Sequence, residues 1–270
     1  MRPMPTDFVC INDTLLIADR DNMKFIKYLF SGDFISEYPF PTSSRKVCIN
    51  PYYISLSPVN SFLYCNVPSM TQSWSAKDKN KRHRVFVISR KNQILNSFCD
   101  YENCFEDFPI LTKCGFFVDK QGNVWISCLY ESAIKIYSPK GELLKTIDIS
   151  EGSDEFIRLK PGQRCNGKKT GVLEKNHIER LINVNNLFVL VGLFIPKNGS
   201  FAWDIISMDG TILHRKLPEK YDYNFLYRCG GDGKDALLLS EDKPFSDSIG
   251  IQTNPSVHIL ALKPQYKTLQ

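Results

Sequence analysis

Cysteine is the residue type in this sequence with the clearest potential for chemistry, because its thiolate is a strong ligand for zinc. The chain has nine cysteines, and no two of them form a Cys-x-x-Cys pair. The closest set is Cys99, Cys104 and Cys114, and no second ligand pair follows at finger-like spacing. Several cysteines lie inside apolar runs, as Cys10 and Cys128 do. We therefore expect free thiols that pack as small hydrophobic side chains, no metal site, and a reducing compartment.

No other catalytic motif stands out. The four histidines are far apart and form no His-x-His or His-Glu-x-x-His spacing, and no nucleophile elbow or phosphate-binding loop occurs. The glycine-rich segment 230–233 lies between apolar runs, where a tight turn explains it. Adjacent acidic pairs such as Asp154-Glu155 point apart in a strand or loop, so they do not predict paired carboxylates.

Two basic segments are the candidate binding sites. The first is the run 77–84, which Trp74 precedes, and the second lies within 151–177. Each segment also fits a solvated loop or an insertion with no binding role. The candidate binding residues are Trp74, Arg82, Arg84, Arg158, Lys160, Arg164 and His177.

Composition limits the function classes. The chain has 270 residues, 43% hydrophobic and 23% charged, which is typical of a globular protein. Its 34 basic and 29 acidic residues are scattered and give a net charge of only +5, so nucleic acid is not an expected partner. No apolar run reaches 18 residues, and the first residues lack the apolar core of a signal peptide. The chain as given predicts a cytoplasmic protein, or a periplasmic or cell-surface one whose leader has been removed.

The elements that must position these residues form a repeat. In the clearest copy, the apolar strand 124–128 is followed by a polar break, the alternating strand 133–137, a Pro-Lys-Gly turn and a further strand. Alternation with period two indicates half-buried strands, and Pro and Gly provide the backbone angles of a tight reversal. The same pattern recurs around residues 14–38, 84–98, 202–214 and 257–269.

Each copy is preceded by a further apolar pair of strands, which gives five units of four strands. Four-stranded units joined by hairpin turns are typical of an all-β propeller. We expect a single domain over 1–270 with blades near 7–41, 42–100, 110–150, 177–218 and 222–270. The segment 151–176 is rich in turn residues, and we expect it to be a long loop.

Two stretches, 17–32 and 124–141, resemble the NHL-type repeat of six-bladed β-propellers. In the first stretch, Ala18-Asp19 and the strand 25–28 match that repeat, and in the second stretch Ile134, Ile136, Tyr137, Pro139 and Gly141 match it. Cys128 and Ala133 stand where the repeat has Asp and Arg. The chain also resembles bacterial six-bladed propellers with diverged repeats. This resemblance implies a blade structure, not a chemistry, and it raises the question of whether five units close the ring.

The function that these observations favour is a non-enzymatic binding or scaffold protein, which presents loops on a propeller face to a protein or small ligand, with no cofactor. The alternative is a hydrolase or lactonase-like enzyme with calcium in the propeller channel. Such enzymes gather oxygen ligands at the ends of inner strands, where Asp119, Asn183 and Asn224 are expected to lie.

Overall fold

Runs of alternating or continuous apolar residues form nineteen β-strands in the part of the chain that the structure describes, and that part holds no helix. The structure is a computed structural model. It describes residues 5–42, 51–67, 83–100, 115–127, 132–151, 153, 155–156, 175–184, 186–197, 199–217, 225–229, 237–241 and 257–261. None of these residues belongs to a helix that is long and apolar enough to cross a membrane.

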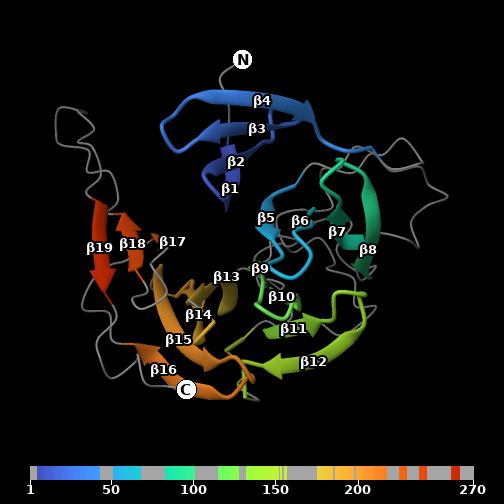
Figure 1. Ribbon diagram of the computed structural model, residues 1–270. Helices are drawn as coiled ribbons and strands as arrows, with labels where there is room; N and C mark the ends of the chain where they lie inside the picture. The colour runs from blue at the N-terminus through green and yellow to red at the C-terminus, as the bar shows by residue number, and fades with distance from the viewer. Residues whose placement is uncertain are drawn as a thin grey trace, which may run out of the picture.

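The strands form five antiparallel sheets in which sequence neighbours pair (Figure 1). The first sheet consists of β1 (Pro5–Ile11), β2 (Thr14–Asp19), β3 (Lys24–Leu29) and β4 (Phe34–Pro39). The second consists of β5 (Tyr53–Leu56), β6 (Leu63–Asn66), β7 (His83–Ile88) and β8 (Ile94–Asp100). The third consists of β9 (Phe116–Val118), β10 (Val124–Ser127), β11 (Ala133–Tyr137) and β12 (Leu143–Asp148).

The fourth sheet consists of β13 (His177–Val184), β14 (Phe188–Ile195), β15 (Ser200–Ser207) and β16 (Ile212–Leu217). The fifth has three described strands, β17 (Phe225–Cys229), β18 (Leu237–Glu241) and β19 (Val257–Ala261). The expected fourth strand of this sheet, near 266–269, lies outside the described residues. The sheets are arranged around a common axis with β1, β5, β9, β13 and β17 innermost, which is a β-propeller (Figure 1). The all-β propeller expected from the sequence is confirmed.

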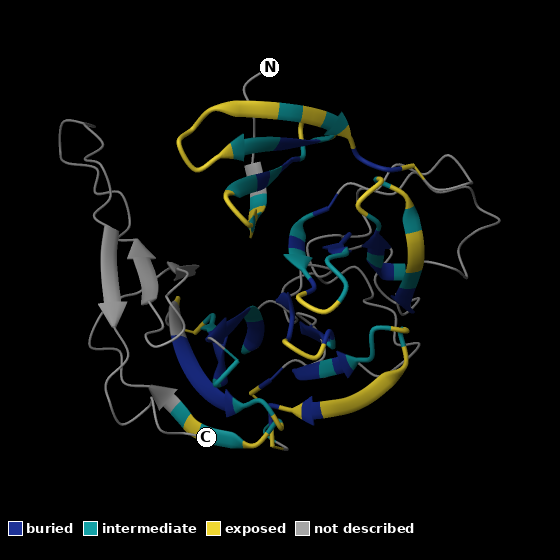
Figure 2. Ribbon diagram, viewed as in Figure 1, coloured by how far each residue is buried: buried dark blue, intermediate teal, exposed yellow. Residues whose placement is uncertain are grey.

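The hydrophobic core is divided among the interfaces between neighbouring sheets. Leu16 and Phe25 of the first sheet pack with Ile54, Leu63 and Ile88 of the second. Further cores join the second sheet to the third and the third to the fourth. The outermost strands contribute less, since five of the six residues of β12 are exposed, whereas β14 is buried over most of its length (Figure 2). Each fully buried Leu, Ile or Phe contributes about 1.5–3 kcal/mol to the free energy of unfolding.

The turns between the third and fourth strands share one geometry. In the turn 138–142, the Gly141 N–H donates to the Ser138 carbonyl, and the Ser138 N–H donates to the Glu142 carbonyl. The turns 29–33, 89–93 and 207–211 repeat both hydrogen bonds. The fourth residue of each turn has a positive φ, and it is Gly32, Asn92, Gly141 and Gly210 in chain order. A register shift in the strand pair accompanies each turn, as expected when the turn ends in a bulge.

Two of these turns also pack closely against the preceding sheet. A Cβ atom on Gly141 would lie 2.7 Å from Cβ of Phe98 in the preceding sheet, and one on Gly210 would lie 2.7 Å from Cδ1 of Ile147. The equivalent Gly32 of the first sheet has no atom within 4 Å of such a Cβ. On the same side of that sheet, Phe34 is 58% exposed and Phe8 is 53% exposed. One face of the first sheet therefore lacks the packing that the next three sheets receive.

Candidate functional site

The connections between strands divide the propeller into two edges. Because strand direction alternates within each sheet, the turns from first to second and from third to fourth strands share one edge, which we call the hairpin edge. The connections from second to third strands, and from each sheet to the next, share the opposite edge, which we call the connection edge. Five of the predicted binding residues, Trp74, Arg82, Arg158, Lys160 and Arg164, lie outside the described residues.

The other two predicted binding residues are described, and both are buried where strands begin at the connection edge. Arg84 of β7 is 1% exposed. Its backbone carbonyl accepts the Val67 N–H at 2.8 Å. His177 opens β13, is 3% exposed, and its Nδ1 lies 2.9 Å from the Lys175 carbonyl oxygen. Neither side chain is presented to solvent on a loop, so both are placed to support the ends of strands.

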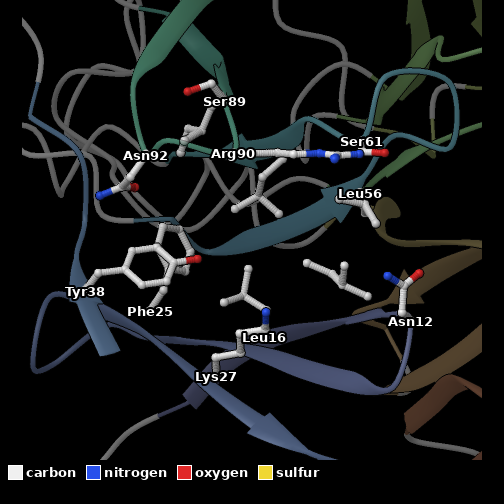
Figure 3. Close-up of a pocket in the computed structure, with 13 residues that line it drawn as sticks. Asn12, Leu16, Phe25, Lys27, Tyr38, Leu56, Ser61, Ser89, Arg90 and Asn92 are labelled. Carbon is white, nitrogen blue, oxygen red and sulfur yellow. The ribbon is translucent and has the colours of Figure 1, made fainter. Parts of the chain in front are cut away.

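A cavity of about 350 Å³ opens at the hairpin edge between the first and second sheets (Figure 3). Its apolar wall includes Leu16, Phe25, Leu63 and Ile88, all less than 9% exposed, which belong to the core that joins the two sheets. Cavities that hold small organic ligands commonly measure about 300–1,000 Å³ and combine such walls with a few polar groups. This cavity is at the lower end of that range.

The polar groups of the cavity come from both sheets. Lys27 extends from β3, and Arg90 extends from the β7–β8 turn on the opposite side (Figure 3). No ion pair between described residues engages either of them. None of the thirteen described lining residues is acidic. The two positive charges are therefore not neutralised by any residue that lines the cavity.

Asn92 also lines the cavity and forms a hydrogen bond between the second sheet and the first. Its Nδ2 donates a 2.9 Å hydrogen bond to the Pro39 carbonyl of β4. This bond fixes the orientation of the amide, because only the NH2 group can donate to a carbonyl. Its Oδ1 is buried and accepts no hydrogen bond from the described residues. Asn92 Oδ1 therefore has no hydrogen-bond donor among the described residues.

The sequence difference at this turn accounts for the position of the cavity. Asn92 occupies the turn position that Gly141 and Gly210 occupy at the next two interfaces. Those glycines approach the preceding sheet too closely for a Cβ. Asn92 instead reaches β4 through its side chain, so the backbone of this turn is held away from the first sheet.

An acidic group lies between the same two sheets, beyond the cavity. The Ile54 backbone N–H donates a 2.7 Å hydrogen bond to Oδ2 of Asp7. Burial raises the pKa of Asp7 to about 7, although this hydrogen bond partly offsets it. Burial, and secondarily the nearby Asp7, raise the pKa of the Cys65 thiol well above its usual value. Burial also raises the pKa of Tyr38, which lines the cavity. Burial between these sheets therefore favours the neutral forms of Asp7, Cys65 and Tyr38.

The residues expected near a channel calcium have other roles. Asp119 accepts hydrogen bonds from the Gln121 and Asn123 backbone N–H groups, from Asn123 Nδ2 and from Trp125 Nε1. Asn183 bonds to Asn186 through both ends of its amide. In the described structure, Asp119 and Asn183 therefore hold turns through these hydrogen bonds, and Asn224 lies outside the described residues. The described residues contain no group of three or more potential metal ligands.

Sequence reasoning missed the cavity residues. The sequence predicts 90–92 only as a turn and Lys27 only as part of a repeat strand. A signal is present nonetheless, because the 89–93 turn lacks the glycine that the equivalent turns have and carries Arg90 two residues before Asn92. Sequence reasoning also expected buried thiols. Cys65 and Cys99 are free and buried as expected, whereas Cys10 is free but exposed.

Comparisons with known proteins extend the description of the fold. No protein-family model matches the chain, and no curated protein matches it in sequence. A catalytically inactive virginiamycin B lyase from Staphylococcus aureus, solved with quinupristin, is 11% identical over 97% of this chain and 70% of that one, with a TM-score of 0.51. A member of the DUF4221 family from Bacteroides vulgatus is 10% identical over 93% of this chain and 76% of that one, with a TM-score of 0.54.

A third structure, of a protein from Bacteroides fragilis, is 13% identical over 88% of this chain and 66% of that one, with a TM-score of 0.55. At these identities the likeness concerns the fold alone. Together with the five sheets, it shows that this chain has a β-propeller fold.

Proposed function

We propose that this protein is a non-enzymatic binding protein that holds a small, largely apolar ligand in the cavity between its first two sheets. The observation that carries the proposal is the cavity itself, which combines a buried apolar wall with polar groups from two separate sheets. The hairpin turns that carry Ser61, Arg90 and Asn92 form its rim, so the ligand is presented on a propeller face.

The lining residues support binding more than catalysis. None of the thirteen described lining residues is His, Cys, Asp or Glu, the side chains that most often act as general bases. The Ser89 hydroxyl accepts the backbone N–H groups of Lys91 and Gln93, which commits it to shaping its turn. Trp74, Arg82, Arg158, Lys160 and Arg164, which lie outside the described residues, remain proposed contacts for a protein partner.

The resemblance to NHL-type repeats is part of the same proposal. The repeat has an Ala-Asp-like pair at the end of its second strand, and Asp19 is 1% exposed at that position. Asp19 accepts hydrogen bonds from Asn22 N at 3.3 Å and from Asn22 Nδ2 at 2.7 Å, which holds the following turn. Holding this turn is a structural reason for an acidic residue at the end of the second strand in a diverged repeat.

The test is a titration of the full chain with N-phenyl-1-naphthylamine, a neutral apolar dye whose fluorescence rises on leaving water. We expect saturable binding that is weakened at least about tenfold by Leu56→Trp, since Leu56 lines the cavity and the larger side chain would fill it. Val59→Trp is the matched control, because it adds the same side chain to the same hairpin at a residue that is 62% exposed. Both variants should keep the circular dichroism spectrum of the wild type.

Binding that is absent from the wild type, or that Leu56→Trp leaves unchanged, would contradict the proposal. Equal weakening by both tryptophan variants would also contradict it, because it would place the dye outside the cavity.

A further inference from the structure

The cavity between the first two sheets has a charge pattern that narrows the kind of ligand it can hold. Its two ionic groups, Lys27 and Arg90, are both positive, and they approach from different sheets (Figure 3). The other polar lining residues are neutral: Asn12, Tyr38, Ser61, Ser89 and Asn92.

The protein does not neutralise these two charges within the described residues. Other cations near the first sheet do have acidic partners, as Lys24 does in its 2.6 Å bond to Glu37 Oε2. Lys27 is on the same strand as Lys24, but its side chain lies on the other face of the sheet. It pairs with Leu16 of β2 and Ser36 of β4, and it is only partly exposed. A cation that is partly withdrawn from water and has no carboxylate nearby gains more from an anion than a fully solvated one does.

Hydrogen-bonding capacity agrees with a polar ligand group at the rim. Arg90 provides a planar set of N–H donors suited to a carboxylate, sulfonate or phosphate. The buried wall of Leu16, Phe25, Leu63 and Ile88 offers nothing to a charged group, so it must contact an apolar part of the ligand.

We propose that the cavity binds amphipathic organic anions, with the apolar body of the ligand against the buried wall and its anionic group between Lys27 and Arg90. This inference rests on the proposed function, because it specifies the chemical class of the ligand in the same cavity. It adds a role for two charges that a purely apolar ligand would not use.

The test compares two dyes with the same ring system. 8-Anilinonaphthalene-1-sulfonate carries an anionic group that N-phenyl-1-naphthylamine lacks. In the double variant Lys27→Gln/Arg90→Gln, we expect the affinity for the sulfonate to fall about tenfold and the affinity for the neutral dye to change less than about twofold. Lys91→Gln is the matched control, because it removes one charge from the same turn at a residue that does not line the cavity.

The outcomes separate the two proposals. If the neutral dye binds in the cavity but the double variant leaves the affinity for the sulfonate unchanged, the anion inference is overturned and the proposed function stands. Equal weakening of both dyes would mean that the variants distort the cavity, and it would also overturn the inference. The inference is also overturned if Lys91→Gln lowers the affinity for the sulfonate as much as the double variant does. Such a result would mean that the overall positive charge of the protein, and not the cavity, attracts the dye. If neither dye binds, the proposed function fails.

Discussion

Gly141 and Phe98 come from neighbouring sheets and lie so close that a Cβ on Gly141 would be 2.7 Å from both Cβ and Cγ of Phe98. The contact joins a hairpin turn of the third sheet to the outermost strand of the second. Asn96 reinforces it by donating from Nδ2 to the Lys140 carbonyl at 3.2 Å. The same relationship recurs one sheet later between Gly210 and Ile147.

Gly141→Ala is expected to destabilise the protein by about 2–5 kcal/mol. An alanine at a φ of +90° costs about 1–2 kcal/mol, and forcing a methyl group into a packed contact costs about 1–3 kcal/mol more. Gly32→Ala is a matched control, because Gly32 has a φ of +94° in the same type of turn but open space around its Cβ position. Urea unfolding of both variants measures the difference, which isolates the contact between sheets. Equal destabilisation would show that Gly32 also packs against a neighbouring element.

Asp7 should make stability depend on pH between about 4 and 7. Its pKa is raised from 3.8 to about 7 in the folded protein, so within this window the folded state holds a proton that the unfolded state has released. The free energy of unfolding therefore falls as pH rises through the window, by at most about 1.4 kcal/mol per pH unit, and the stabilisation is fully present only below about pH 4.

Asp7→Asn should remove this dependence and keep an acceptor for the Ile54 N–H. The variant is expected to be more stable than the wild type at pH 8, with the difference shrinking as pH falls to 4. Chemical unfolding at several pH values measures the free energy of unfolding of both proteins. Asp21→Asn is the control, because Asp21 is exposed. A stability difference between Asp7→Asn and wild type that is constant with pH would contradict this prediction.

Cys10 should react with thiol reagents much faster than Cys65 and Cys99. Cys10 is exposed on β1, whereas the other two thiols are buried. Burial also raises the pKa of Cys65, which keeps it in the unreactive protonated form. Brief alkylation of the native protein followed by peptide mass spectrometry measures the order of labelling. All nine cysteines should label in denaturant without reductant, and a lower number would reveal disulfides.

The exposed apolar face of the first sheet should promote self-association. Phe8 and Phe34 are each more than half exposed there, and the partly exposed Leu15, Ile17 and Tyr28 lie between them. Phe34→Glu is expected to reduce concentration-dependent light scattering, because an apolar face of this kind favours contact with another molecule. Leu144→Glu, on the outer strand of the third sheet, is the control at a residue with 56% exposure. A wild type that stays a compact monomer at all concentrations would contradict the prediction.

The strands, the turns and the repeat can be predicted from local sequence patterns alone. Those features depend on the period-two alternation of segments such as 133–137 and on turn residues such as Gly141, and both act over a few neighbouring residues. The five-unit pattern could therefore be predicted, and so could the all-β propeller. The burial of Cys65 followed from the same reasoning, because a small apolar side chain inside a strand run usually faces a core.

Which polar residues come into contact depends on how the sheets pack, and local sequence does not predict it. Asn92 and Pro39 are 53 residues apart, yet their hydrogen bond fixes the spacing of two sheets and the cavity between them. Lys27 and Arg90 lie in ordinary repeat positions, and their shared cavity depends on how the first sheet packs on the second. Arg84 and His177 each end a basic segment of the sequence and lie where a strand begins, and both are buried in the folded protein. Contacts between sheets join segments that are far apart in the sequence, and the local pattern of one segment does not depend on the other. Local patterns therefore predict the blades but not the surfaces between them.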